Sequence, residues 1–243
     1  MIIPSVLMVT SCAKVFVQPP AIQQRKTYTM SIRVNTQAVQ AEPLSERSRA
    51  ALSTEVAGQW LVSVEPVLIN RDESQWFSIR VKVEEGTQVL SELSGKGFEV
   101  RAFPWGTLLD VRHYGSVSGE KRGLDAMDIV VPALFPEPPI DETKTSTVRW
   151  PLERYGLRWG TSVAQLQWSQ GETLSYSGTW DFQPRYNPPL EITATGAAQG
   201  AVQLDPQGGI KAHTMKWHRR VRFPSGVQQE QHFEVRLQMR EQE

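Results

Sequence analysis

The feature that most constrains the fold of this chain is an alternation of apolar and polar residues with a period of two. It is sharpest from Glu172 to Gln183. One face of that segment carries Leu174, Tyr176, Trp180 and Phe182, and the other carries Thr173, Ser175, Ser177, Thr179 and Asp181. One buried and one wet face are typical of a strand in an antiparallel sheet. The same pattern recurs along the chain, so the sequence predicts a mainly β protein.

Strand-like segments form two runs with one helix-like segment between them. The first run covers residues 28–39, 56–64, 77–83, 97–103 and 107–114. The second covers residues 157–159, 162–168, 172–182, 190–204, 210–223 and 227–239. A turn is expected from Asn70 to Ser74. Apolar residues at helical spacing predict a helix from Glu120 to Phe135, and the prolines at 136, 138 and 139 end it. Pro132 either kinks this helix or confines its later part to a separate turn. The expected fold is a large curved, half-barrel-like antiparallel sheet with this one helix packed on its concave face.

Three glycines predict hairpin loops of three residues, at 104–106, 169–171 and 224–226. The last loop sets the register of the C-terminal hairpin. In that register Trp217 faces Phe233 and Met215 faces Val235, all inward. The outward pairs are Arg220 with Glu230, Lys216 with Glu234 and His218 with His232. A slip by one residue would turn an apolar set toward water.

The only cysteine, Cys12, closes the sequence Val9-Thr10-Ser11-Cys12, which resembles the bacterial lipobox. The resemblance implies a signal peptide over residues 1–12 and lipid on Cys12. No basic residue precedes Cys12, so a buried N-terminal strand is the alternative. The proline-containing segment 13–24 favours the anchor because it reads as an extended tether. Residues 25–243 are then a single mainly β domain, or two halves joined near 135–150.

Charge and the residue after the cysteine bear on partners and location. Lys plus Arg equals Asp plus Glu, at 26 each, so no field steers the protein to nucleic acid. Ala13 follows Cys12, which in a Gram-negative cell indicates the outer membrane. The expected location is the cell envelope, on the periplasmic side of the outer membrane. The expected partners are the membrane, through lipid on Cys12, and a partner protein or an apolar ligand.

One predicted strand has unusually small residues on its core-facing side: Ala194, Gly196, Ala198 and Gly200. Small side chains either leave room for a ligand or let another element approach closely. The first interpretation makes these four residues the floor of an apolar groove for a lipid tail or a partner peptide. The second makes them the seam on which the predicted helix packs.

The sequence predicts no catalytic residue, metal site or cofactor. The segment Gly115 to Gly119 has Val117 where a nucleophile elbow needs its nucleophile. His213, His218 and His232 lie close together in the chain, but no Asp or Glu at a ligand-like spacing completes a site. The basic run from Lys211 to Arg222 faces acidic cross-strand partners, so it is interpreted as a solvated strand face.

The helical segment is followed by Leu134-Phe-Pro-Glu-Pro-Pro-Ile140, then by Trp150 and a run of strands. This order resembles a group of uncharacterised bacterial envelope lipoproteins, over about Asp125 to Glu243. The resemblance implies a mainly β fold and brings no catalytic residues. In architecture alone, the expected fold is similar to that of periplasmic lipoprotein carriers, in which a curved half-barrel sheet encloses a helix.

These observations predict a lipid-anchored cell-envelope protein with a non-enzymatic binding role, for an apolar ligand or a partner protein. Two alternatives stay open. One is an accessory subunit of a larger membrane complex. The other is an enzyme that modifies a cell-envelope polymer.

Overall fold

The structure is a computed structural model of the 243-residue chain. It describes residues 22, 24–40, 54–86, 97–103, 107–114, 126–138, 144–154, 157–170, 173–184, 193–206, 209–222 and 228–240. All structural statements below concern these residues. Within them, no helix has the length and apolar character needed to cross a membrane.

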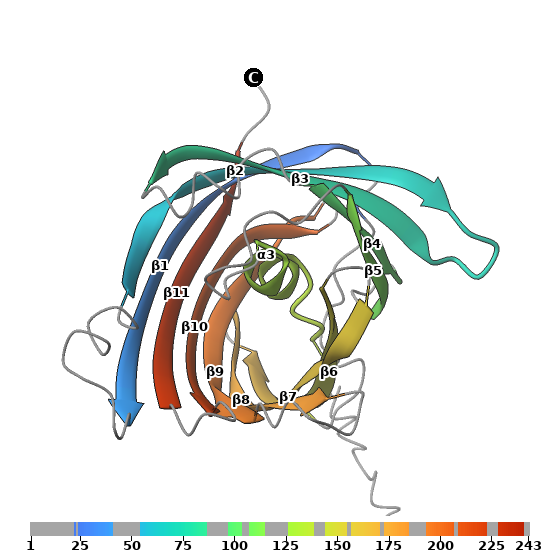
Figure 1. Ribbon diagram of the computed structural model, residues 1–243. Helices are drawn as coiled ribbons and strands as arrows, with labels where there is room; N and C mark the ends of the chain where they lie inside the picture. Colours follow the sequence, from blue (N-terminus) through green and yellow to red (C-terminus); the bar gives the residue numbers. More distant parts are fainter. Residues whose placement is uncertain are drawn as a thin grey trace, which may run out of the picture.

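Eleven antiparallel strands form one sheet in the order β5-β4-β3-β2-β1-β11-β10-β9-β8-β7-β6. The sheet curls until it is nearly closed into a barrel, with β5 and β6 at its two edges (Figure 1). The predicted mainly β fold with a curved antiparallel sheet is confirmed. The strands are β1 (Lys26–Gln40), β2 (Thr54–Ile69), β3 (Gln75–Gly86), β4 (Gly97–Ala102), β5 (Leu108–Tyr114), β6 (Thr145–Arg154), β7 (Leu157–Gln170), β8 (Leu174–Pro184), β9 (Thr193–Leu204), β10 (Ile210–Arg222) and β11 (Gln228–Met239).

The period-two alternation places the core as predicted. On β8, Leu174, Tyr176 and Trp180 are buried. The side chain of Phe182 lies outside the described residues. The two segments predicted at 157–159 and 162–168 are one continuous strand, β7. Strand β6 was not predicted, because its sequence contains Pro151 and proline is uncommon within strands. The proline is tolerated here because β6 is an edge strand that pairs only with β7.

The predicted register of the C-terminal hairpin is confirmed. In the ladder of β10 and β11, Trp217 pairs with Phe233 and Lys216 pairs with Glu234. Trp217 and Phe233 are both buried, with their ring centroids 6.3 Å apart. The loop predicted at 224–226 lies outside the described residues. Aromatic burial therefore selects the register, and the outward ion pairs agree with it.

The other two predicted loops have different outcomes. Next to the loop at 104–106, which lies outside the described residues, the Phe103 N–H donates to the Thr107 carbonyl at 3.0 Å, as a three-residue loop requires. The loop predicted at 169–171 is wrong, because β7 continues through Gln170, which pairs with Leu174. This register places Trp168 opposite Tyr176, with centroids 4.8 Å apart inside the sheet. Burying that aromatic pair therefore outweighs the preference of Gly171 for the third position of the loop.

The one described helix, α3 (Ala126–Leu134), lies inside the curl of the sheet (Figure 1). It contacts β6, β10 and β11, and its residues Ile129 to Leu134 are buried. Pro132 lies within α3, which continues to Leu134. The helix therefore does not end at this proline. Residues 120–125 of the predicted helix lie outside the described residues. The following segment, 135–138, is itself largely buried rather than only a connection.

A buried histidine joins α3 to the sheet. His213 on β10 donates from Nδ1 to the carbonyl of Ala133, at 2.7 Å, and its Nε2 accepts from the hydroxyl of Tyr176, at 2.9 Å. Ala133 is in the last turn of α3, where carbonyls have no partner within the helix. Burial lowers the pKa of His213 to about 4, so the ring is neutral at neutral pH. His213 therefore holds the helix in place as a structural residue.

A partly buried glutamate lies where the two edges of the sheet approach each other. Glu137 follows α3 and accepts a hydrogen bond from the N–H of Leu108 on β5, at 2.8 Å. The positive charge of Arg149 on β6 also acts on its carboxyl group. Burial is the larger effect and raises the pKa of Glu137 to about 8. The side chain supplies an acceptor to an edge strand whose N–H has no neighbouring strand to bond.

Replacing Glu137 with Gln is expected to stabilise the protein at alkaline pH. The folded-state pKa lies above the usual 4.5, so the wild-type protein loses stability as pH rises from about 4.5 through 8. Gln keeps an acceptor for Leu108 and cannot ionise. Above pH 8 we expect Glu137→Gln to have a free energy of unfolding about 2 kcal/mol higher than wild type. Urea denaturation at several pH values measures this, with the exposed Glu65→Gln as control. An advantage that does not shrink toward pH 5 would contradict it.

The start of β1 is fixed by an ion pair between Lys26 and Asp205, both buried. Lys26 also pairs across the sheet with Val64 on β2. This pairing is close to the end of β2, so the chain enters the sheet beside the hairpin that joins β2 to β3.

Candidate functional site

Cys12, the predicted lipidation site, lies outside the described residues. The four small residues are on β9, where Ala198 is buried, only 3% exposed. Aromatic rings occupy the space beside two of the others. A Cβ atom at Gly200 would lie 2.5 Å from the ring of Tyr176, and one at Gly196 would lie 2.8 Å from Nε1 of Trp180. An apolar ligand at these two positions would have to displace the rings.

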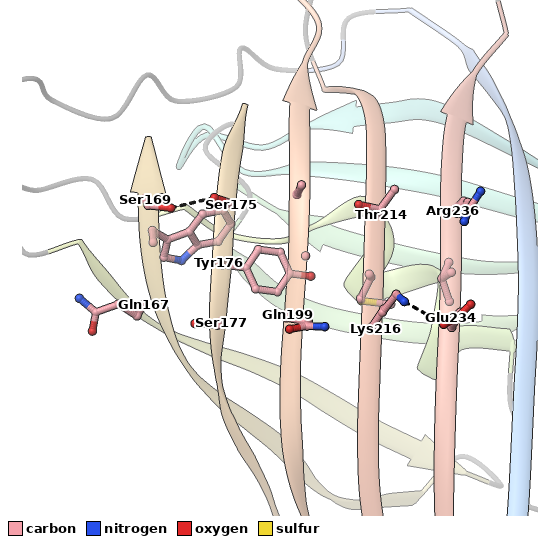
Figure 2. A pocket seen from close by; sticks show the side chains of 15 residues that line it. Gln167, Ser169, Ser175, Tyr176, Ser177, Gln199, Thr214, Lys216, Glu234 and Arg236 are labelled. Carbon is pink, nitrogen blue, oxygen red and sulfur yellow. Dashed lines mark hydrogen bonds and ion pairs between the residues drawn. The ribbon is translucent and has the colours of Figure 1, made fainter. Parts of the chain in front are cut away.

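A shallow pocket of about 550 Å³ lies across strands β7 to β11 (Figure 2). Its polar lining forms two rows that follow the strand register. One row contains Gln167, Ser177, Gln199, Lys216 and Glu234, and the other contains Ser169, Ser175, Ala201, Thr214 and Arg236. Figure 2 shows the labelled members of the two rows one above the other.

The polar lining of this pocket combines neutral hydrogen-bonding groups with one ion pair and the guanidinium of Arg236. Lys216 and Glu234 are 3.0 Å apart, and the lysine holds the pKa of Glu234 below its usual value. Ser169 and Ser175 share a hydrogen bond of 2.7 Å. Glu234 is the only carboxylate among the lining residues, so the pocket lacks a second acid for paired general acid and base catalysis.

The structure separates the three clustered histidines. His213 points into the core, whereas His218 and His232 stand opposite each other on the outer face, with ring centroids 4.6 Å apart. Glu230 joins these two histidines, contrary to the expectation that no Asp or Glu completes a site. The nitrogen and oxygen ligand atoms of His218, Glu230 and His232 lie within 4.8 Å of one another. The missed signal is the spacing Glu230-x-His232, because residues two apart on a strand share a face.

The most exposed apolar surface among the described residues is at the end of β2. Val67, Leu68 and Ile69 are 56%, 56% and 69% exposed. We call these three residues the apolar tip. They lie on the hairpin of β2 and β3, which projects beyond the rest of the sheet at the right of Figure 1. Single exposed aliphatic residues are common, but three consecutive ones on a projecting hairpin form a patch.

A polar network braces the turn that follows the apolar tip. The N–H of Asn70 donates to the carbonyl of Ser74 at 2.7 Å. Arg101, from β4, donates to Oδ2 of Asp72 at 2.7 Å and to the hydroxyl of Ser74 at 2.9 Å. Hydrogen bonds from Ser74, together with the charge of Arg101, lower the pKa of Asp72. The hairpin therefore presents its apolar side chains on a fixed support.

No protein-family model matches the chain, and no curated protein matches its sequence. The assignment of function therefore rests on the residues and on their arrangement.

Proposed function

We propose that this protein is a lipid-anchored cell-envelope protein with a non-enzymatic binding role, and that the apolar tip is its binding surface. The observation that carries the proposal is the exposure of Val67, Leu68 and Ile69 together on a braced, projecting hairpin. Exposed apolar patches with polar residues around them mark sites of interaction with proteins or membranes. Here the polar residues Asn70, Arg71, Asp72 and Glu73 follow the tip.

The position of β1 favours the membrane as the surface that the tip meets. Thirteen residues lie between Cys12 and Lys26, where the chain joins the sheet. Lys26 pairs with Val64, three residues before the tip. A lipid on Cys12 and the apolar tip would then reach the same bilayer from the same end of the sheet. The proposed location is the periplasmic side of the outer membrane, and a second contact strengthens attachment through a lipid.

The test combines the anchor with the tip. We expect the wild-type protein to stay with membranes through an alkaline carbonate wash and the full-length Cys12→Ser variant to be released by that wash. At neutral pH, purified Cys12→Ser should still float with phospholipid vesicles through the apolar tip. Adding Leu68→Asp and Ile69→Asp should lower its partition at least about tenfold, because burying one aliphatic side chain contributes about 1.5–3 kcal/mol.

Val39 is the matched control for the tip. It is a similarly exposed aliphatic residue, at 51%, on the opposite end of β1 from Lys26. Adding Val39→Asp to Cys12→Ser should leave flotation unchanged. If wild type and Cys12→Ser are both soluble, the lipid anchor is wrong. If Cys12→Ser does not float, or if Val39→Asp acts like the tip variants, the bilayer is not the surface that the tip meets.

A further inference from the structure

Three potential metal ligands meet on the outer face of β10 and β11. His218 and His232 are directly opposite each other in the ladder, and Glu230 lies two residues before His232 on the same face. Their ligand atoms lie within 4.8 Å of one another, and Nε2 of His218 is 3.9 Å from Oε2 of Glu230. Strands, rather than flexible loops, position all three side chains.

Arg220 holds the carboxylate of this group in place. It pairs with Glu230 in the ladder, and its Nε donates to Oε1 at 3.1 Å. That contact uses one oxygen and leaves Oε2 on the side of His218. Partners of this kind commonly orient the ligands of metal sites.

We propose that His218, Glu230 and His232 bind a divalent transition-metal ion, with Zn²⁺ as the best match. Imidazole suits zinc, copper and nickel, whereas calcium and magnesium prefer sites built from oxygen. Two histidines and one carboxylate form a three-ligand set that leaves a coordination position open. Zinc bonds of about 2.0–2.2 Å bring ligand atoms to roughly 3.5 Å from one another. The ligand atoms now lie within 4.8 Å of one another. Because the three side chains are accessible to solvent, they can rotate and bring these atoms to the distance that zinc requires.

The surroundings leave the open position accessible. Side-chain exposure is 41% for His218 and 23% for Glu230. On the far side of His218, β9 contributes the small residue Ala197. Lys216 and Glu234, which line the polar pocket, lie two residues from His218 and His232 on the same face. A bound ion would therefore stand at the margin of that pocket. This site is separate from the apolar tip and does not depend on the lipid anchor.

Titration of metal-free, untagged protein with zinc chloride at neutral pH tests the site. Isothermal calorimetry should give one Zn²⁺ per chain with a micromolar dissociation constant. His218→Ala and His232→Ala should each weaken binding about 100-fold, and Glu230→Gln about tenfold. Glu234→Gln is the matched control, since it removes the neighbouring carboxylate of the same ladder, and should change binding less than about twofold. Co²⁺ absorption in the visible range should report coordination by nitrogen and be lost in both histidine variants.

Circular dichroism in the presence of a chelator establishes that each variant is folded before its titration. Absence of zinc binding by the wild-type protein would overturn the proposal. Binding that both histidine variants retain would also overturn it. The three residues would then be only a stacked histidine pair beside an Arg–Glu ion pair. Equal weakening by Glu230→Gln and Glu234→Gln would remove Glu230 from the ligand set, because the effect would be one of general surface charge.

Discussion

Replacing His213 with Leu is expected to lower the free energy of unfolding by about 3 kcal/mol at neutral pH. Leu fills most of the ring's volume but makes neither of its hydrogen bonds. The carbonyl of Ala133 and the hydroxyl of Tyr176 would both lose the partner they have in His213 inside the core. The attachment of α3 to the sheet would weaken as a result. Urea denaturation followed by tryptophan fluorescence measures the loss.

The same substitution has a distinctive dependence on pH. The pKa of His213 in the folded protein is about 4, below the usual 6.5, because burial opposes the charged ring. As pH falls from 6.5 to 4, the unfolded chain takes up a proton that the folded protein does not, and wild type loses about 3 kcal/mol. His213→Leu has no imidazole ring to protonate, so its free energy of unfolding does not fall for this reason. The stability difference between the two proteins should therefore shrink toward zero near pH 4.

The control is His218→Leu on the same strand, measured with a chelator present. His218 is 41% exposed on its side chain, so we expect a change within about 0.5 kcal/mol. Other titrating groups, including Glu137, act equally on wild type and His213→Leu and cancel in their difference. A difference that stays constant from neutral to acidic pH would show that His213 is not held neutral by burial.

Ala198→Trp is expected to destabilise the protein by at least about 3 kcal/mol or to prevent folding. Ala198 is buried, and its cross-strand partners are Gly178 and Trp217. The neighbouring space already holds the rings of Trp180 and Trp217, whose centroids are 6.1 Å apart. A third indole ring there must displace core side chains or the sheet backbone. Thermal and chemical denaturation measure the effect.

This substitution also tests the predicted groove on β9. Gln199→Trp is its matched control, because the neighbouring residue faces outward and is exposed. The control should change stability by less than about 0.5 kcal/mol. If Ala198→Trp folds with wild-type stability and abolishes uptake of an apolar fluorescent probe, the small residues line a groove. Loss of stability without any probe uptake by the wild-type protein identifies a packed seam.

Most of the local β-structure could be predicted from the sequence. The faces of β8 and the register of β10 with β11 follow from alternation within short segments, where a wrong choice exposes several apolar residues at once. The turn from Asn70 to Ser74 follows from local hydrogen bonding. Where turn preference and the packing of core side chains disagreed, the packing prevailed. The glycine loop at 169–171 was not formed because Trp168 pairs with Tyr176.

Neither candidate site was predicted from the sequence, although the residues of each lie within one hairpin. The predicted register already places Glu230 beside the two histidines, because residues two apart on a strand share a face. Spacing along the chain alone does not show this, since His218 lies on the facing strand. The apolar tip had no sequence signal of its own. In the sequence, the apolar tip resembles the end of a buried strand. Its three residues are exposed because the hairpin extends past Lys26, where β1 begins.

The sequence by itself determined the class of structure, the inward and outward faces of its clearest strands and the C-terminal register. These depend on the period of the side chains and on neighbours a few residues away. Only the tertiary structure decided that β1 lies beside β11 and that His213 binds the end of the helix instead of joining His218 and His232. Those outcomes depend on closing loops of tens to hundreds of residues, and local alternation carries no information about which distant surfaces complete the core.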